Sequence, residues 1–512
     1  MSRLKRFTHS LASGYLSLGV NVVYTLASVP LALYYLSRAE FGLWAVVMQL
    51  ALNLQLLVDL GMSGAVSRIL IDHKDEKTAT GYGTVIQTGV LAMLVQGGLV
   101  ALIGGVASLW LPQWMNVAPE FWRVFRVLML WQCAFLGMSF AVRIFPFILQ
   151  AHQRYDILNY ACVGGFVVNL LALWAGFHWN LGLFSMLVAS AANLIFFNLY
   201  CLIAVWHLRL LPARGCWGRA SYRAFREIFS YANNLFLMSV GQVLISVSQV
   251  PVIGALLGME AAAVWSVATK VFMLAQQMIT RIFEFSVAAF AEMMVRGERE
   301  RLQSRFRDMT ALTAATGGLV CLMVAVCNRG FLALWTHHRI AWAGQNDLLM
   351  ALFIIVGAIT RCHIGLAGQT KQIRAMKYIY LVEGGVFIVL SLALAQWLGL
   401  AGIILGGMVS NLLCSGLYGL HRTTGYFQIS AREVLGVWLA APARMFLMVL
   451  AAAGALWFAT RNLQPVAQFV VNAAALGLVG GWCFWKIGLT ESLRNEVAGL
   501  MGKARLKFSG AA

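Results

Sequence analysis

Two stretches, RIFPFILQAHQ at residues 143–153 and RCHIGLAGQTKQ at residues 361–372, share one pattern. Each places an arginine in apolar sequence and follows it with two glutamines three residues apart. Other features of the first half also recur, and over all of these features the offset between the copies drifts only from 221 to 218. They are Val29-Pro30 with Trp44, recurring as Val250-Pro251 with Trp265, and Gly164, Gly165 and Gly182, recurring as Gly384, Gly385 and Gly402. In an apolar chain, such a duplication predicts a two-lobed membrane transporter with its substrate held between the repeats.

The composition places the chain among polytopic α-helical membrane proteins. Of its 512 residues, 61% are hydrophobic and only 11% are charged, and the mean hydropathy is +0.77. A soluble protein of this length would carry roughly twice that charged fraction. The net charge of +19 fits basic residues gathered in cytosolic loops, and it gives no reason to expect nucleic acid as a partner.

Apolar runs long enough to cross a bilayer recur from end to end. We predict about fourteen spans, at 11–36, 41–67, 82–111, 124–149, 157–178, 181–206, 229–257, 261–294, 309–328, 346–368, 375–396, 400–420, 434–459 and 464–485. With both termini in the cytosol, 27 of the 38 Lys and Arg residues fall in cytosolic segments and six on the opposite side. The positive-inside rule therefore predicts that both ends of the chain lie in the cytosol.

Six spans precede the second copy, so both copies run in the same direction through the membrane. We expect five segments: an N-lobe at 1–206, a cytosolic linker at 207–228, a C-lobe at 229–421, two further spans at 422–488, and an amphipathic tail at 489–512. The linker mixes five arginines with aromatic residues, a composition that suits an interfacial helix on anionic lipid headgroups.

Several function classes are disfavoured. The sequence holds no phosphate-binding loop and no dinucleotide-binding glycine pattern, so ATP-driven transport by this chain alone is not expected. The nine cysteines show no paired spacing, and no metal site or organic cofactor is predicted. The loops opposite the cytosol are short, which argues against a glycan-processing enzyme.

Charged residues inside predicted spans are the main site candidates, because such charges usually face a cavity or a partner. They are Asp59, Arg143, Lys270, Arg281, Glu284, Arg361, Glu383 and Arg444. The cations could line a cavity and bind phosphate, which the planar arginine fork suits. Alternatively, Arg143 and Arg361 could reach headgroups, and Glu284 could neutralise Arg281.

Polar residues extend these candidates. Lys270, Gln277 and Arg281 fall on one face of a helix, as does each of two repeat-related stripes. The stripes are Asn21, Thr25 and Ser28, recurring as Gln242, Ser246 and Gln249. They could contact sugar hydroxyls or join helices by hydrogen bonds. Asp59, Glu284 and Glu383 could couple transport to protons or Na⁺, or could form salt bridges and helix caps.

The order and spacing of several short motifs resemble the bacterial polysaccharide flippase family, which is related to the lipid II flippases and the multidrug and toxin extrusion (MATE) transporters. The matching stretches are Glu40-Phe41-Gly42-Leu43-Trp44, Asp59-Leu60-Gly61 leading to Arg68, Leu257-Gly258 leading to Trp265-Ser266-Val267-Ala268, Gly368-Gln369-Thr370-Lys371, and Glu383 through Leu398-Gly399-Leu400-Ala401-Gly402. Relatives often carry an aspartate in the seventh span, where this chain has Ser248-Gln249-Val250-Pro251.

The resemblance implies a V-shaped, MATE-like fold that alternates between inward and outward states. It also implies a flippase, not an enzyme, that moves polyprenyl-pyrophosphate-linked oligosaccharide of the O-antigen or exopolysaccharide kind across the inner membrane. Membrane lipids, a glycan polymerase and assembly proteins are its expected partners. Two other functions stay open at this stage: a multidrug or cation antiporter, which should have an acidic cavity, and an integral glycan-processing enzyme.

Overall fold

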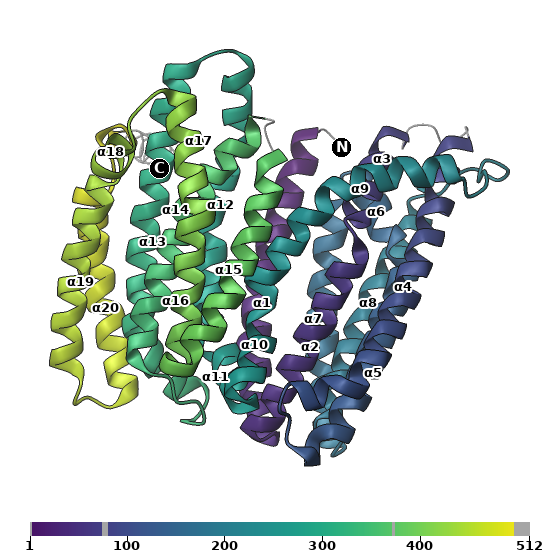
Figure 1. Cartoon of the computed structure of the whole chain (residues 1–512), viewed down its shortest axis with the longest axis horizontal. Coiled ribbons are helices and arrows are strands. Elements are labelled where there is room, and N and C mark those ends of the chain that lie inside the picture. The colour runs from purple at the N-terminus through teal and green to yellow at the C-terminus, as the bar shows by residue number, and fades with distance from the viewer. Residues whose placement is uncertain (1–2, 74–79, 371–373, 496–512) are drawn as a thin grey trace, which may run out of the picture. The chain divides into compact units, whose positions relative to one another are not determined.

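The computed structural model describes residues 3–73, 80–370 and 374–495, and these residues form helices without any strand (Figure 1). The α-helices are α1 Arg3–Tyr35, α2 Arg38–Asp59, α3 Met62–His73, α4 Thr80–Trp114, α5 Trp122–Val142, α6 Ile144–Ala151, α7 Tyr155–His178, α8 Phe184–His207, α9 Tyr222–Gln242, α10 Gln249–Leu257, α11 Met259–Ala268, α12 Lys270–Val295, α13 Arg299–Trp335, α14 Gly344–Gln369, α15 Arg374–Leu398, α16 Leu400–Asn411, α17 Leu417–Phe427, α18 Ala431–Glu433, α19 Ala440–Thr460 and α20 Pro465–Cys483. Shorter turns are the 3₁₀ turn η1 Pro119–Phe121 and the π-helical turns η2 Val243–Val247, η3 Leu412–Gly416, η4 Val434–Trp438 and η5 Phe484–Gly488.

The all-helical membrane fold predicted from the sequence is confirmed. Within the described residues, 13 helical segments are long and apolar enough to cross a membrane. The predicted span at 261–294 is not among them. It forms two helices, α11 and α12, which meet at Thr269, and α12 carries Lys270, Arg281 and Glu284. These charges lower the hydropathy of α12.

The chain divides into two compact units, Met1–Ser266 and Val267–Ala512, here called unit 1 and unit 2. In unit 1, α4 packs along α5, and α7 packs along α8 and α1 (Figure 1). Helix α10, from the seventh predicted span, packs on α2, and α9 packs on α3. The boundary between these units, at Ser266, differs from the linker at 207–228 that the sequence predicts between the lobes. The lobe boundaries stay a prediction.

In unit 2, the long helix α13 packs against α12, α14, α19 and α20. Near the start of α13, Phe306 is fully buried and lies edge-on to Phe283, Phe290 and Trp438. Edge-to-face aromatic pairs of this kind add about 0.5–1.5 kcal/mol each beyond the area they bury. This cluster fixes the second half of α12, which carries Glu284, against the rest of the unit. Most of the predicted amphipathic tail, 496–512, lies outside the described residues, as does Lys371 of the glycine motif.

Candidate functional site

Two predicted spans of unit 1 are broken at their charged residues. The span predicted at 41–67 forms α2 and α3, and between them Leu60 and Gly61 both adopt positive φ angles, 51° and 74°. The left-handed conformation ends a helix, and it suits glycine at the second position. The span predicted at 124–149 likewise forms α5 and α6, which meet at Arg143.

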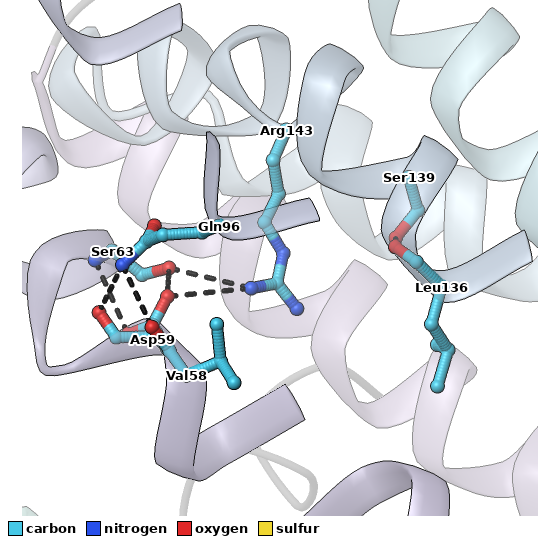
Figure 2. Close-up of polar contacts among 7 residues, drawn as sticks. All are labelled: Val58, Asp59, Ser63, Gln96, Leu136, Ser139 and Arg143. Atoms are coloured by element: carbon cyan, nitrogen blue, oxygen red, sulfur yellow. Dashed lines mark hydrogen bonds and ion pairs between the residues drawn. The ribbon is translucent and has the colours of Figure 1, made fainter. Parts of the chain in front are cut away.

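Polar contacts join the two breaks into what we call the polar joint (Figure 2). It is formed by the side chains of Asp59, Ser63, Gln96 and Arg143 and by the backbone of Val58. Asp59 accepts hydrogen bonds from the backbone N–H of Ser63 at 3.3 Å and from the Ser63 hydroxyl, which caps the start of α3. Gln96 donates to the carbonyl oxygens of Val58 at 2.9 Å and Asp59 at 2.8 Å. The otherwise unpaired backbone groups at this break are thereby satisfied.

Arg143 completes the polar joint. Its Nη1 lies 3.5 Å from Asp59 Oδ1 and 3.4 Å from Ser63 Oγ, and its guanidinium lies 4.5 Å from the centre of the Phe140 ring. The side chains of Arg143 and Asp59 are only 24% and 13% exposed. Arg143 is therefore engaged by protein groups on several sides, and Asp59 acts as both a helix cap and an ion-pair partner.

Replacing Asp59 with asparagine should destabilise unit 1 by about 1–3 kcal/mol, because the half-buried guanidinium of Arg143 loses its counter-charge. The matched control is Asp72→Asn. Asp72 also pairs with an arginine, Arg68, at 2.5 Å, but the two side chains are 50% and 56% exposed, so its loss should change stability by less than about 1 kcal/mol. Thermal unfolding of the purified variants measures both. Equal losses would contradict the role given to Asp59.

Unit 2 holds a second cluster, the arginine pair, in which Arg281 and Arg361 share Glu284. Arg281 Nη1 lies 3.4 Å from Glu284 Oε2, and Arg361 Nη2 lies 3.0 Å from Glu284 Oε1. One carboxylate thus faces two guanidinium groups, which leaves a net charge of +1 at the cluster. The arginine side chains are 62% and 56% exposed, so most of their N–H donors remain open to a ligand.

Lys270 is a further cation of α12. It is the first residue of this helix and is exposed. It makes no hydrogen bond or ion pair with any residue that the structure describes. Gln277 and Arg281 on the same helix are exposed as well, as their common helical face predicts. Eleven residues separate Lys270 from Arg281, which is about 16 Å along the helix axis. Lys270 is therefore a second cationic position, distinct from the arginine pair.

The two copies of the repeat place their arginines in related but unequal surroundings. Arg143 and its counterpart Arg361 each pair with a carboxylate from the second predicted span of their copy. The carboxylates are not equivalent, because Glu284 corresponds at offset 221 to Ser63 and not to Asp59. Helix α14 also continues through Arg361, whereas the first copy is broken at Arg143.

Glu383 lies elsewhere in unit 2 and is 1% exposed. Its carboxylate accepts hydrogen bonds from Asn411 Nδ2 at 3.0 Å, from the backbone N–H of Ser415 at 3.2 Å, and from the Ser415 hydroxyl. Ser415 belongs to the π-helical turn η3, and such turns often occur at functional positions. The structure does not bring Glu383 together with Glu284 through any direct contact between them.

The polar stripes lie in varied surroundings. Asn21 is half-buried on α1. Gln242 is exposed, while Gln249 is 7% exposed and donates to the carbonyl oxygen of Ile245, in the preceding π-helical turn η2, at 3.1 Å. The π-helical turn η2 lies between these two glutamines and changes the helical register that the predicted stripe assumed. The sequence pattern alone gave no sign of this turn. The Ser246 side chain lies outside the described residues.

Some polar contacts were missed by the sequence reasoning. Gln96 was not predicted to bridge to α2, and the buried Asp347 was not counted among the in-span charges. Asp347 falls one residue inside the predicted edge of its span at 346–368, so its position in the sequence was a usable signal. Arg444, another of the predicted in-span charges, is exposed on α19.

The family model described as polysaccharide biosynthesis protein matches residues 12–294, more than half of the chain. The chain belongs to this family. The match covers the polar joint and α12 with Lys270, Arg281 and Glu284 of this polysaccharide biosynthesis protein, but it ends before Arg361 and Glu383. A search of curated proteins gave no match.

Solved structures show the same fold. A lipid II flippase, MurJ, in an inward closed conformation is similar with a TM-score of 0.68 and 10% identity, over 93% of this chain and 98% of MurJ. An inward-facing MATE multidrug transporter gives a TM-score of 0.64 at 15% identity, over 80% of this chain and 96% of the transporter. A transporter of the same superfamily from Pyrococcus furiosus gives 0.56 at 17% identity, over 83% and 97%. This member of the polysaccharide biosynthesis family is therefore a multi-pass membrane protein with a MATE and MurJ type of fold.

Proposed function

We propose that the protein is a flippase that moves polyprenyl-pyrophosphate-linked oligosaccharide across the cytoplasmic membrane by alternating access, for the synthesis of surface polysaccharide of the O-antigen or exopolysaccharide kind. The observation that carries the proposal is the net positive, exposed arginine pair, formed by Arg281 of α12 and Arg361 of α14, together with Lys270 at the start of α12. Two guanidinium groups with free N–H donors suit a phosphate-bearing headgroup, since each can make parallel charge-assisted hydrogen bonds.

The arginine pair and Lys270 divide the headgroup contacts in this proposal. A pyrophosphate that binds Arg281 and Arg361 does not reach an α-carbon position about 16 Å away along α12. Lys270 would then attract the headgroup at another stage of translocation. Gln277, which lies between Lys270 and Arg281 on α12, would contact a sugar. Asn21, Gln242 and Gln249 would contact sugar hydroxyls or join helices. Arg143 would stabilise unit 1, because protein groups already surround it.

Coupling to a proton or Na⁺ gradient belongs to the same proposal. Among its three carboxylates, Glu383 is the best supported, because its buried carboxylate accepts hydrogen bonds from the neutral groups of Asn411 and Ser415 and forms no ion pair with a residue that the structure describes. Asp59 and Glu284 are already paired with arginine. Both chain ends would lie in the cytosol, and a glycan polymerase and assembly proteins would receive the product.

Reconstitution of the full chain into liposomes tests the proposal. With a polyprenyl-pyrophosphate-linked oligosaccharide in both leaflets, we expect the protein to expose the inner pool to an external lectin or glycosidase. Parallel efflux of a cationic dye should show no activity, since the exposed cluster is basic. Dye efflux without oligosaccharide translocation would instead identify a multidrug antiporter, and release of free sugar or lengthened glycan would identify an enzyme.

A further inference from the structure

A cavity of about 750 Å³ lies within unit 2, away from the arginine pair. Helices α13, α14, α19 and α20 and the loop between α13 and α14 form its walls. This is the end of the helices that the charge distribution predicts to be external. Along α14, the cavity residue Asp347 lies about 21 Å from Arg361. We call this space the external cavity.

Two buried polar side chains line the external cavity and keep unused hydrogen-bonding capacity. Gln468 is 7% exposed, and its side-chain amide makes no hydrogen bond with any residue that the structure describes. Asp347 is 2% exposed and uses one oxygen, Oδ1, to accept from Asn328 Nδ2 at 2.7 Å and from Trp342 Nε1 at 2.8 Å. No hydrogen bond from a described residue reaches its other oxygen, Oδ2. Buried amides and carboxylates seldom stay unpaired, so these groups indicate a polar ligand.

Aromatic and charged groups surround these two side chains. Trp342 and Trp457 line the cavity, and the bond from Trp342 Nε1 to Asp347 fixes the indole ring and the carboxylate together. The remaining polar lining comes from Gln345, Arg329 and His338. Small-ligand sites of this volume commonly combine aromatic walls with a few fixed polar groups. A carboxylate with two amides suits hydroxyl groups, and an indole face suits the C–H face of a sugar ring.

We propose that the external cavity is a carbohydrate-binding site, which takes a sugar unit on the external side and is separate from the cationic positions of α12. The carboxylate disfavours a lone phosphate group, whereas Arg329 and His338 would accept an acidic sugar. The choice of a sugar over another polyol rests on the proposed function, because a flippase for lipid-linked oligosaccharide releases sugars on that side.

Saturation-transfer NMR with the full chain in phosphatidylcholine nanodiscs tests the site. The probes are glucose, galactose, N-acetylglucosamine, rhamnose and glucuronate, with glycerol as a polyol control. We expect transfer to at least one sugar and none to glycerol. Gln468→Leu and Asp347→Asn should each weaken sugar binding about fivefold, the size of effect expected from one lost hydrogen bond. The matched control is Gln464→Leu, which makes the same change at an exposed position one turn earlier on the same chain segment and should leave binding unchanged.

Absence of transfer to every sugar, equal transfer to glycerol, or full binding in both cavity variants with unchanged thermal unfolding would each overturn the site. Loss of the sugar signal in nanodiscs that contain phosphatidylglycerol would assign the cavity to a lipid headgroup and overturn it as well. If one cavity variant fails to fold, the other variant and the comparison of sugars with glycerol still decide. The binding assay uses free sugars and measures no translocation, so absence of sugar binding would leave the flippase proposal intact. Sugar binding without translocation in the liposome assay would reject only the flippase proposal.

Discussion

Exchange of Lys270 for glutamate should lower translocation of the lipid-linked oligosaccharide by at least about tenfold in the liposome assay, with no loss of folded protein. Lys270 has no partner among the described residues, so its removal breaks no protein contact. The new carboxylate would repel a passing pyrophosphate. A tenfold effect corresponds to about 1.4 kcal/mol, which one such repulsion at close range reaches even with substantial water screening.

Two variants make the Lys270 result specific. Lys377→Glu introduces the same charge change in unit 2 at a half-buried lysine near the start of α15, and translocation should stay within about twofold of the native rate. Lys270→Arg preserves the cation and should retain most of the activity. Native translocation by Lys270→Glu, or an equal loss in Lys377→Glu, would reject Lys270 as a substrate contact.

Replacement of Gly42 with alanine should destabilise unit 1 by about 3 kcal/mol or more and sharply reduce the yield of folded protein. A Cβ atom at this position would overlap the carbonyl oxygen of Met259 and lie 2.7 Å from its carbonyl carbon. Both atoms belong to the backbone, so no flexible side chain can move aside. The glycine lies in α2, in the Glu40 to Trp44 motif, and permits the close approach of the chain at Met259.

Gly98→Ala is the control for Gly42. Gly98 lies within α4, and a Cβ atom there would meet nothing within 4 Å. Alanine should leave this helix unchanged or stabilise it by about 0.5–1 kcal/mol, since glycine is the poorer helix former. Fluorescence-detected size exclusion and thermal unfolding compare the two variants. A stable, monodisperse Gly42→Ala protein would show that α2 can shift away from Met259 at little energetic cost.

Sequence periodicity and hydropathy were sufficient for the helical membrane fold, because a bilayer leaves few ways to satisfy the backbone. The breaks were harder to predict. Leu60-Gly61 could have been recognised as a helix end, but nothing in the apolar run around Arg143 distinguishes a break from a continuous helix. The more polar α12 shows the same difficulty, since its charges were predicted to line a cavity within one uninterrupted span.

The candidate site was predictable in its residue types but not in its pairings. Glu284 was expected to neutralise Arg281 through their separation of three residues on one helix. The contact from Arg361 to the same carboxylate joins residues 77 positions apart and depends on how α12 packs against α14. Asp347, Asn328 and Trp342 likewise meet only after the chain folds, because their hydrogen bonds join α13, α14 and the loop between them.

The break at Arg143 and the continuous helix at Arg361 give the two arginines different availability to a competing anion. A ligand that takes Arg361 displaces one exposed ion pair, an exchange worth no more than about 1 kcal/mol. A ligand that takes Arg143 must also remove the counter-charge of a carboxylate that caps α3. In the proposed transport cycle, Arg361 can therefore exchange its carboxylate partner for a substrate anion at a lower cost than Arg143 can.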